Sequence, residues 1–204
     1  NVTPLSTLVT VSDAATVEQL LSAVSDGLTL EEVLSQDTWQ QAENNESSAQ
    51  AIQTVNSQII AVVNSISKLT NKDNITTSKN VIDALVSGQN NAVLSTLNEV
   101  TTITNVINEI AANDTSIAPV NNSVASALSQ IIATTNNVIR KNQTNITSGA
   151  LSEVIAASQS SLPEKVAALV AGNITVEEFS EETNQAVVLD TDNDGVLDAN
   201  DAFP

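Results

Sequence analysis

The sequence predicts an all-α fold, an antiparallel multi-helix bundle, and two kinds of observation lead to that prediction. Apolar residues recur at steps of three and four along three long segments, which places them on one face of a helix. Hydroxyl residues also stand three positions before Glu or Gln at the start of several apolar stretches, a pattern typical of helix N-termini. The content of β-branched residues is high for helices, but propensity is a weaker signal than periodicity.

In chain order, the prediction begins with a short lead-in and continues with one helical domain. Residues 1–15 contain Pro4 and an alternation of apolar and polar positions, which predicts an extended or irregular segment. Residues 16–188 are predicted to form the helical bundle domain. Its three long segments carry apolar stripes that run from Trp39 to Leu69, from Val93 to Ile110 and from Ile117 to Val138. Shorter helices are predicted over residues 17–25, 30–36, 77–86, 149–157, 163–171 and 176–188.

Particular residues mark where these helices start and where the chain breaks. In a capping box, a hydroxyl accepts a hydrogen bond from a backbone N–H that has no partner within the helix. Four such pairs are predicted, namely Thr16 with Gln19, Thr29 with Glu32, Ser161 with Glu164 and Thr175 with Glu178. Glycines stand where breaks are needed, at Gly27, Gly88, Gly149 and Gly172.

The residue types that the chain lacks exclude several classes of functional site. There is no His, Cys, Tyr or Met, and the only aromatic residues are Trp39, Phe179 and Phe203. Zinc sites of the usual kind, haem, iron–sulfur clusters and catalytic triads based on His or Cys are therefore excluded. Carboxylates are plentiful and could form a catalytic pair, but a solvated acidic surface is the simpler interpretation. Because no set of nucleophile, base and oxyanion donor can be assigned, we expect a protein that is not an enzyme.

The net charge limits the partners. Asp and Glu number 24 against 6 Lys and Arg, which gives a formal charge of −18. Such a surface repels nucleic acid and anionic membranes, so neither is an expected partner. The longest apolar runs are far too short to cross a bilayer, so no membrane insertion is expected. No signal peptide is visible, and the chain reads as an excised part of a longer protein.

The C-terminal segment carries aspartates at a regular spacing. From Asp190 to Asp201 they stand at offsets 1, 3, 5, 9 and 12, with a glycine at offset 6 that permits a sharp turn. Ca²⁺ takes several oxygen ligands and tolerates such variety, whereas Mg²⁺ requires a tighter octahedron. The sequence therefore predicts a C-terminal calcium-binding loop. Its predicted metal ligands are Asp190, Asp192, Asp194, the carbonyl of Val196, Asp198 and Asp201.

This loop differs from an EF-hand. Offset 12 normally carries Glu, which reaches the ion with both oxygens, and Asp201 is one methylene shorter. An EF-hand also needs a helix after the loop, but only Ala202, Phe203 and Pro204 follow it.

The string from Asp190 to Pro204, DTDNDGVLDANDAFP, resembles a thrombospondin type 3-like repeat. Such repeats recur in tandem in large surface and secreted proteins of Gram-negative bacteria, and neighbouring repeats share ions. The resemblance implies that the ligands named above bind calcium and that residues 189–204 begin a linker or stalk. The opening phrase VTPLSTLV is similar to one that precedes helical regions in bacterial surface adhesin-like proteins.

These observations predict a non-catalytic extracellular module of a large bacterial surface protein, either structural or adhesive, with a calcium-rigidified C-terminal junction. Acidity, the richness in Ser, Thr and Asn, and the calcium loop all favour a secreted or cell-surface location. Its other partners would be neighbouring domains of the parent chain or a surface ligand. One alternative is a helical domain that binds a peptide or glycan in a groove, for which an exposed Trp39 would be the signature. Another is an accessory region of a secreted polysaccharide-degrading enzyme.

Overall fold

The computed structural model describes residues 3–25, 27–35, 41–42, 44, 46–87, 93–114, 121–141, 143, 155–156 and 161–187. Within these ranges the chain is mostly helical and contains no strand, which confirms the all-α prediction. The helices are α1 (Pro4–Val11), α2 (Ala14–Val24), α3 (Leu30–Ser35), α5 (Ser47–Thr70), α6 (Asn74–Ser87), α7 (Val100–Asn113), α8 (Asn122–Lys141), α10 (Ser161–Val170) and α11 (Val176–Val187). A short 3-10 helix, η1 (Val93–Thr96), precedes α7.

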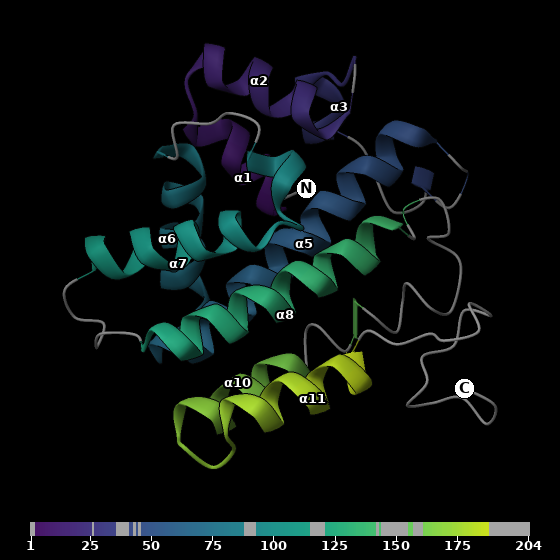
Figure 1. The fold of residues 1–204 in the computed structure, drawn as a ribbon. Helices are drawn as coiled ribbons and strands as arrows, with labels where there is room; N and C mark the ends of the chain where they lie inside the picture. The colour runs from purple at the N-terminus through teal and green to yellow at the C-terminus, as the bar shows by residue number, and fades with distance from the viewer. Residues whose placement is uncertain are drawn as a thin grey trace.

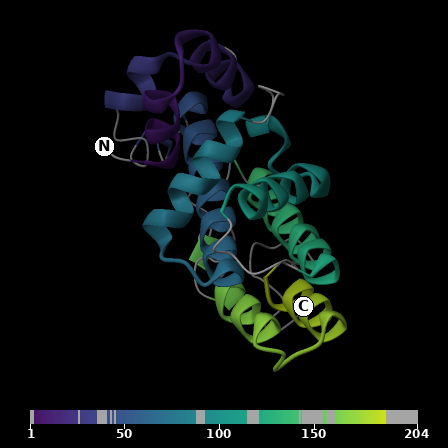
Figure 2. The ribbon, with the colours of Figure 1, turned by 90° about the vertical axis from the view of Figure 1, so that its left-hand side faces the viewer.

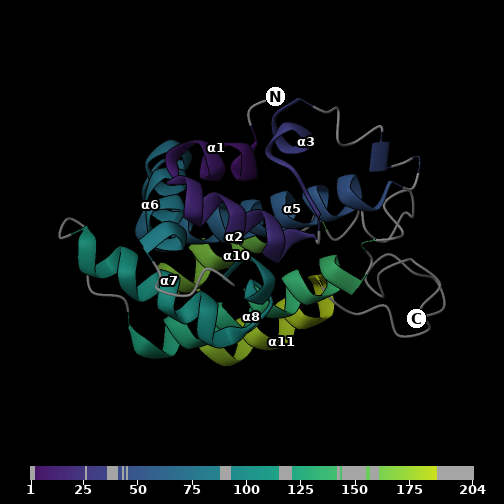
Figure 3. The same cartoon turned by 90° about the horizontal axis from the view of Figure 1, so that it is seen from above.

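Helix α5 is the centre of the fold. It packs against α1, α2, α3, α6, α8 and α10, so it is covered on most of its circumference. Helices α1 to α3 lie on one side of α5, and α10 and α11 lie on the other (Figures 1 and 2). Helix α8 runs beside α5 and also contacts α7 and α11. Seen from above, α1 lies beside α6 (Figure 3).

The core is almost wholly aliphatic. One large cluster of Leu, Ile, Val and Ala side chains joins the helices, and Phe179 on α11 is its single aromatic member among the described residues. The stripe predicted between Trp39 and Leu69 is buried from Ala49 onward, as the three- and four-residue steps require. The helix itself begins at Ser47. Trp39 lies outside the described residues.

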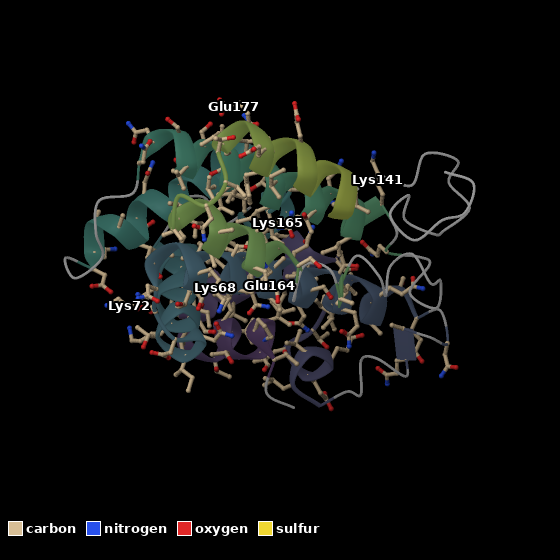
Figure 4. All side chains as sticks on the ribbon, turned by 90° about the horizontal axis from the view of Figure 1, so that it is seen from below. Lys68, Lys72, Lys141, Glu164, Lys165 and Glu177 are labelled. Carbon is tan, nitrogen blue, oxygen red and sulfur yellow. The ribbon has the colours of Figure 1, made fainter. Side chains whose placement is uncertain are left out.

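Charged side chains stay on the surface. Figure 4 shows Lys68, Glu164, Lys165 and Glu177 on the face formed by the end of α5 together with α10 and α11. Both signs are mixed there, which is the ordinary composition of a solvated face. Lys72, two residues after the end of α5, pairs with Asp114, the residue that follows α7, at 3.6 Å.

The centre of α5 also buries polar side chains, which the sequence stripes did not predict. The Gln58 amide donates to the backbone carbonyl of Asn136 on α8 at 2.8 Å. The Asn136 amide in turn donates to the carbonyl of Leu97 at 2.7 Å, in the segment between η1 and α7. Gln58 and Asn136 are both buried, so these two bonds link three separate parts of the chain inside the core.

The extended or irregular lead-in predicted for residues 1–15 is wrong, because the chain is helical from Pro4 to Val11. Thr3 forms a capping box with Ser6, and Pro4 occupies the first turn, where its missing N–H costs nothing. Leu5, Leu8 and Val9 are buried at helical spacing against α5. The apparent alternation of apolar residues was therefore the inner face of a helix.

Two of the four predicted capping boxes are confirmed. Thr29 and Glu32 exchange hydrogen bonds of 2.8 and 3.3 Å between side chain and backbone. Thr175 and Glu178 do the same at 2.8 and 3.1 Å. The box predicted at Thr16 is wrong, because α2 begins at Ala14 and Asp13 is its cap, accepting from the Thr16 N–H at 2.8 Å. Ser161 is already the first residue of α10.

Residues with a positive φ angle occur at three of the breaks between helices. Gly27 and Gly172 have φ of 77° and 73°, a left-handed conformation that favours glycine, as predicted for these breaks. Asn71 takes a similar conformation, with φ of 53°, at the turn between α5 and α6. The second predicted stripe is interrupted, because η1 and a turn precede α7.

Carboxylates at helix starts give the fold an acid-sensitive component. Backbone N–H groups that donate to Asp13, Glu32, Asp73 and Glu178 lower the pKa of each carboxyl. At Asp73 the main donor is the Thr76 N–H, at 2.9 Å. A lowered folded-state pKa adds stability above the unfolded-state pKa and loses it as the pH falls through the folded-state pKa.

Replacing Asp73 by Asn keeps a capping oxygen but removes the titrating charge. We expect wild type to exceed the variant in free energy of unfolding by a constant amount above about pH 5, and by progressively less as the pH falls toward about 3. Urea unfolding at a series of pH values measures this difference. Glu18→Gln, an exposed change on α2, controls for the loss of one negative charge. An Asp73→Asn difference that stays independent of pH across this range would contradict the prediction.

Candidate functional site

The predicted calcium ligands, Asp190, Asp192, Asp194, Val196, Asp198 and Asp201, lie outside the described residues. The structure does describe the helix that leads to them. Helix α11 ends at Val187, and its Phe179 side chain is completely buried where α11 packs against α8 and α10. The loop would therefore follow directly on a helix that belongs to the core.

The described ranges contain neither a metal-binding cluster nor a membrane-spanning helix. No group of three or more Asp, Glu, His or Cys side chains in these ranges could hold a metal ion. No described helix is both long and apolar enough to span a membrane.

A groove with a mostly apolar lining lies between α1, α5 and α6. It has a volume of about 560 Å³, within the range of small-ligand sites. The consecutive helices α5 and α6 meet the distant α1 there, with α1 beside α6 and both against α5 (Figure 3). Its lining comprises Thr3, Pro4, Thr7, Val11, Ile59, Ile60, Val63, Asn64, Asn74, Ile75, Ser78, Lys79, Ile82 and Asp83.

The groove has a buried aliphatic floor and exposed aliphatic edges. The floor is formed by three buried core residues that also line the cavity, Ile59, Val63 and Ile82. At the edges, the side chains of Ile75 and Val11 are 85% and 58% exposed. Two large apolar side chains are thus exposed to water beside an apolar cavity. Covering this surface with a ligand would lower the free energy of the system.

The polar rim of the groove is nearly neutral. The Lys79 ammonium and the Asp83 carboxylate form an ion pair one turn apart on α6. The Asn74 amide donates to the Asn64 side-chain oxygen at 3.3 Å and links α6 to α5. On a protein of net charge −18, this patch therefore carries no excess of negative charge among its lining residues.

Hydrogen bonds hold the walls of the groove in place. The Leu5 N–H, in the first turn of α1, donates to the buried Asn56 side-chain oxygen of α5 at 2.9 Å. At the turn between α5 and α6, the Ser67 hydroxyl donates to the Lys72 carbonyl at 2.6 Å. Asp73 then caps α6 by accepting from the N–H groups of Ile75 and Thr76, both at 2.9 Å. The cavity is thus formed before any ligand arrives.

Sequence reasoning did not find this groove, because it depends on how three helices meet. One local signal was present: Ile75, a large apolar residue in the first turn of α6, stands seven positions before Ile82 and so extends the same helix face, although it is not buried. The alternative function proposed from the sequence, a groove between helices, has a physical candidate here. No protein-family model, curated protein or solved structure matches the chain.

Proposed function

We propose that this chain is a non-catalytic extracellular module of a large bacterial surface protein, structural or adhesive, built as an antiparallel helical bundle that leads into a calcium-rigidified junction. The observation that carries the proposal is the position of α11. Only two residues separate its end at Val187 from Asp190, the first predicted ligand. A calcium ion held at residues 190–201 would be connected to the core through a short, anchored helix.

Because α11 is packed into the core, a calcium ion bound just after it would be attached to a rigid part of the fold. Phe179 is buried, and the side chains of Ile174, just before α11, and of Val176, its first residue, pack against the same core cluster. Calcium would hold the oxygens of Asp190, Asp192, Asp194, Asp198 and Asp201 and the carbonyl of Val196 together, offsetting the repulsion among five carboxylates. The chain leaving the bundle would then keep a fixed direction toward a neighbouring domain of the parent protein.

A calcium titration by calorimetry and thermal unfolding tests the proposal. We expect binding of about one ion per chain and a rise in melting temperature with calcium. The double variant Asp192→Ala, Asp194→Ala should lose both effects, because it removes two adjacent ligands. The matched control is Glu18→Ala, Glu181→Ala, which removes the same charge from exposed positions on α2 and α11. Absence of binding at millimolar calcium, or equal loss in the control, would contradict a self-sufficient site.

The groove supports a second candidate function, the capture of a surface ligand. Its lining is aliphatic and contains no aromatic side chain on which a sugar ring could stack. A neutral peptide segment with aliphatic side chains is therefore a better match than a glycan. Both functions are compatible with one module, in which α1 and α6 carry the ligand on one side and α11 carries the junction on another. The same bundle could equally connect the domains of a secreted polysaccharide-degrading enzyme.

A further inference from the structure

An exposed ridge on α6 forms one edge of the groove between α1, α5 and α6. Ile75, Lys79 and Asp83 line the groove and stand four residues apart, so their side chains follow one another along the helix surface. Ile75 is 85% exposed, and the side chains of Lys79 and Asp83 are 74% and 55% exposed. The ridge therefore stands in water beside the apolar floor, where another molecule can reach both.

The two helices that border the groove, α1 and α6, carry almost no charge. They lie side by side (Figure 3). Helix α1 contains no charged residue, and Lys79 and Asp83 are the only charged residues of α6. Asp73, just before α6, accepts hydrogen bonds from the N–H groups of Ile75 and Thr76 at the positive end of the helix. On a protein of formal charge −18, two copies of this face can therefore meet with little local repulsion.

The ion pair of Lys79 and Asp83 is self-complementary. In a two-fold contact between identical molecules, residue i of one copy meets residue j of the other, and residue j meets residue i. If two α6 helices cross antiparallel about an axis between positions 79 and 83, Lys79 faces Asp83 of the partner subunit at two equivalent places. The pair within each copy allows this second contact, because an ammonium has three donors and a carboxylate has two acceptor oxygens.

We propose that a second copy of this chain covers the groove, in a two-fold contact between the α1 and α6 faces of the two molecules. The α6 edge of that copy is the neutral aliphatic segment proposed above for the groove, so the assignment rests on that second candidate function. An acidic partner would be repelled by the protein, and a basic partner would be attracted more strongly elsewhere on its acidic surface. In the contact, the exposed side chains of Ile75 and Val11 of both copies leave the water.

The expected contact is weak. Charges elsewhere on the two copies repel one another, although physiological salt screens interactions between exposed charges beyond about 8 Å. A contact that uses one face of two short helices also belongs to the small, transient class of interfaces. We therefore expect a dissociation constant of about 0.1 mM at physiological salt.

Sedimentation equilibrium of the full chain, at concentrations up to about 1 mM, tests the proposal with two charge-reversal variants. Lys79→Asp leaves two acidic groups on the ridge and Asp83→Lys leaves two basic groups, so each variant alone should dimerise about tenfold more weakly than wild type. A mixture of the two, with one of them fluorescently labelled, should regain the wild-type affinity, because opposite charges then meet at both places. Both variants stay strongly negative overall, so a general attraction between them cannot produce this recovery.

Lys141→Asp and Glu18→Lys are the matched controls. They make the same two changes of charge at exposed positions on α8 and α2, outside the groove lining. Each should dimerise within about twofold of wild type, because screening limits the effect of a distant charge. Circular dichroism checks that all four variants keep the helical fold.

Three results would overturn the proposal, and they differ in what they leave of the groove. A chain that stays monomeric but binds a neutral peptide of alternating leucine and serine keeps the groove as a ligand site for another protein. Absence of both the dimer and peptide binding removes the groove from either role. A dimer that the two ridge variants do not weaken, or that their mixture does not restore, has its contact on another face.

Discussion

Replacing Phe179 by Ala is expected to lower the free energy of unfolding by about 3–5 kcal/mol. Phe179 is completely buried and is the single aromatic member of the described core. It lies where α11 packs against α8 and α10, so its removal leaves a cavity between three helices that the surrounding side chains can fill only in part. Urea unfolding followed by circular dichroism measures the loss.

Two controls separate this packing effect from a general sensitivity of the region. Phe179→Leu keeps much of the apolar volume and should cost clearly less than Phe179→Ala. Val170→Ala changes a residue of α10 that is 46% exposed and should fall within about 0.5 kcal/mol of wild type. If Phe179→Ala unfolded at the same urea concentration as wild type, α11 would not be anchored as the structure shows.

The same variant bears on the calcium junction. Should α11 transmit calcium binding to the bundle, Phe179→Ala is expected to keep calcium affinity but to reduce the rise in melting temperature that calcium produces. Retention of the full rise would mean that the ion stabilises the protein by another route.

Replacing Ile59 by Ala is expected to cost about 2–5 kcal/mol, whereas the same replacement at Ile75 should change stability by no more than about 0.5 kcal/mol. Ile59 is fully buried in α5, while Ile75 is 85% exposed on α6, yet both line the groove. Because the deleted atoms are identical, the difference between the two variants measures burial alone. Chemical denaturation gives both values under one set of conditions.

The Ile75→Ala variant also tests whether the groove binds a ligand. A fluorescently labelled neutral peptide of alternating leucine and serine is a suitable probe. Ile75→Ala should weaken its binding about tenfold, because covering part of an isoleucine side chain contributes on the order of 1–2 kcal/mol. Val170→Ala, which shortens an exposed apolar side chain on α10 instead, should not affect it. Equal affinities for wild type and Ile75→Ala would remove the groove from consideration as the peptide site.

The sequence predicted best those features that depend on residues close together in the chain. The steps of three and four from Ala49 to Leu69 describe the buried face of α5, and the boxes at Thr29 and Thr175 mark helix starts that the structure confirms. Both patterns depend on neighbours within one or two turns. Periodicity therefore overrode the modest helix propensity of a chain rich in Val, Ile and Thr, as it should when burial supplies most of the stability.

Features that depend on distant residues were missed. Helix α1 is fixed by Thr3 and Ser6 locally but also by Asn56, which lies 51 positions away and accepts from the Leu5 N–H. The groove needs three helices to meet. No window of sequence contains that information. The predicted calcium ligands, in contrast, come from a strictly local spacing and stay a prediction, since Asp190 to Asp201 lie outside the described residues.

The bonds from Gln58 to the Asn136 carbonyl and from Asn136 to the Leu97 carbonyl also bear on which of several possible packings the chain adopts. Stripes made of Ile, Leu, Val and Ala resemble one another, so α8 could slide along α5 by one helical turn, about 5.4 Å, and still find aliphatic neighbours. Such a slide would break both bonds and leave buried amides without partners, at a cost of about 1–3 kcal/mol for each group. The apolar residues supply the attraction between the two helices, and two amide side chains determine the register at which they stop.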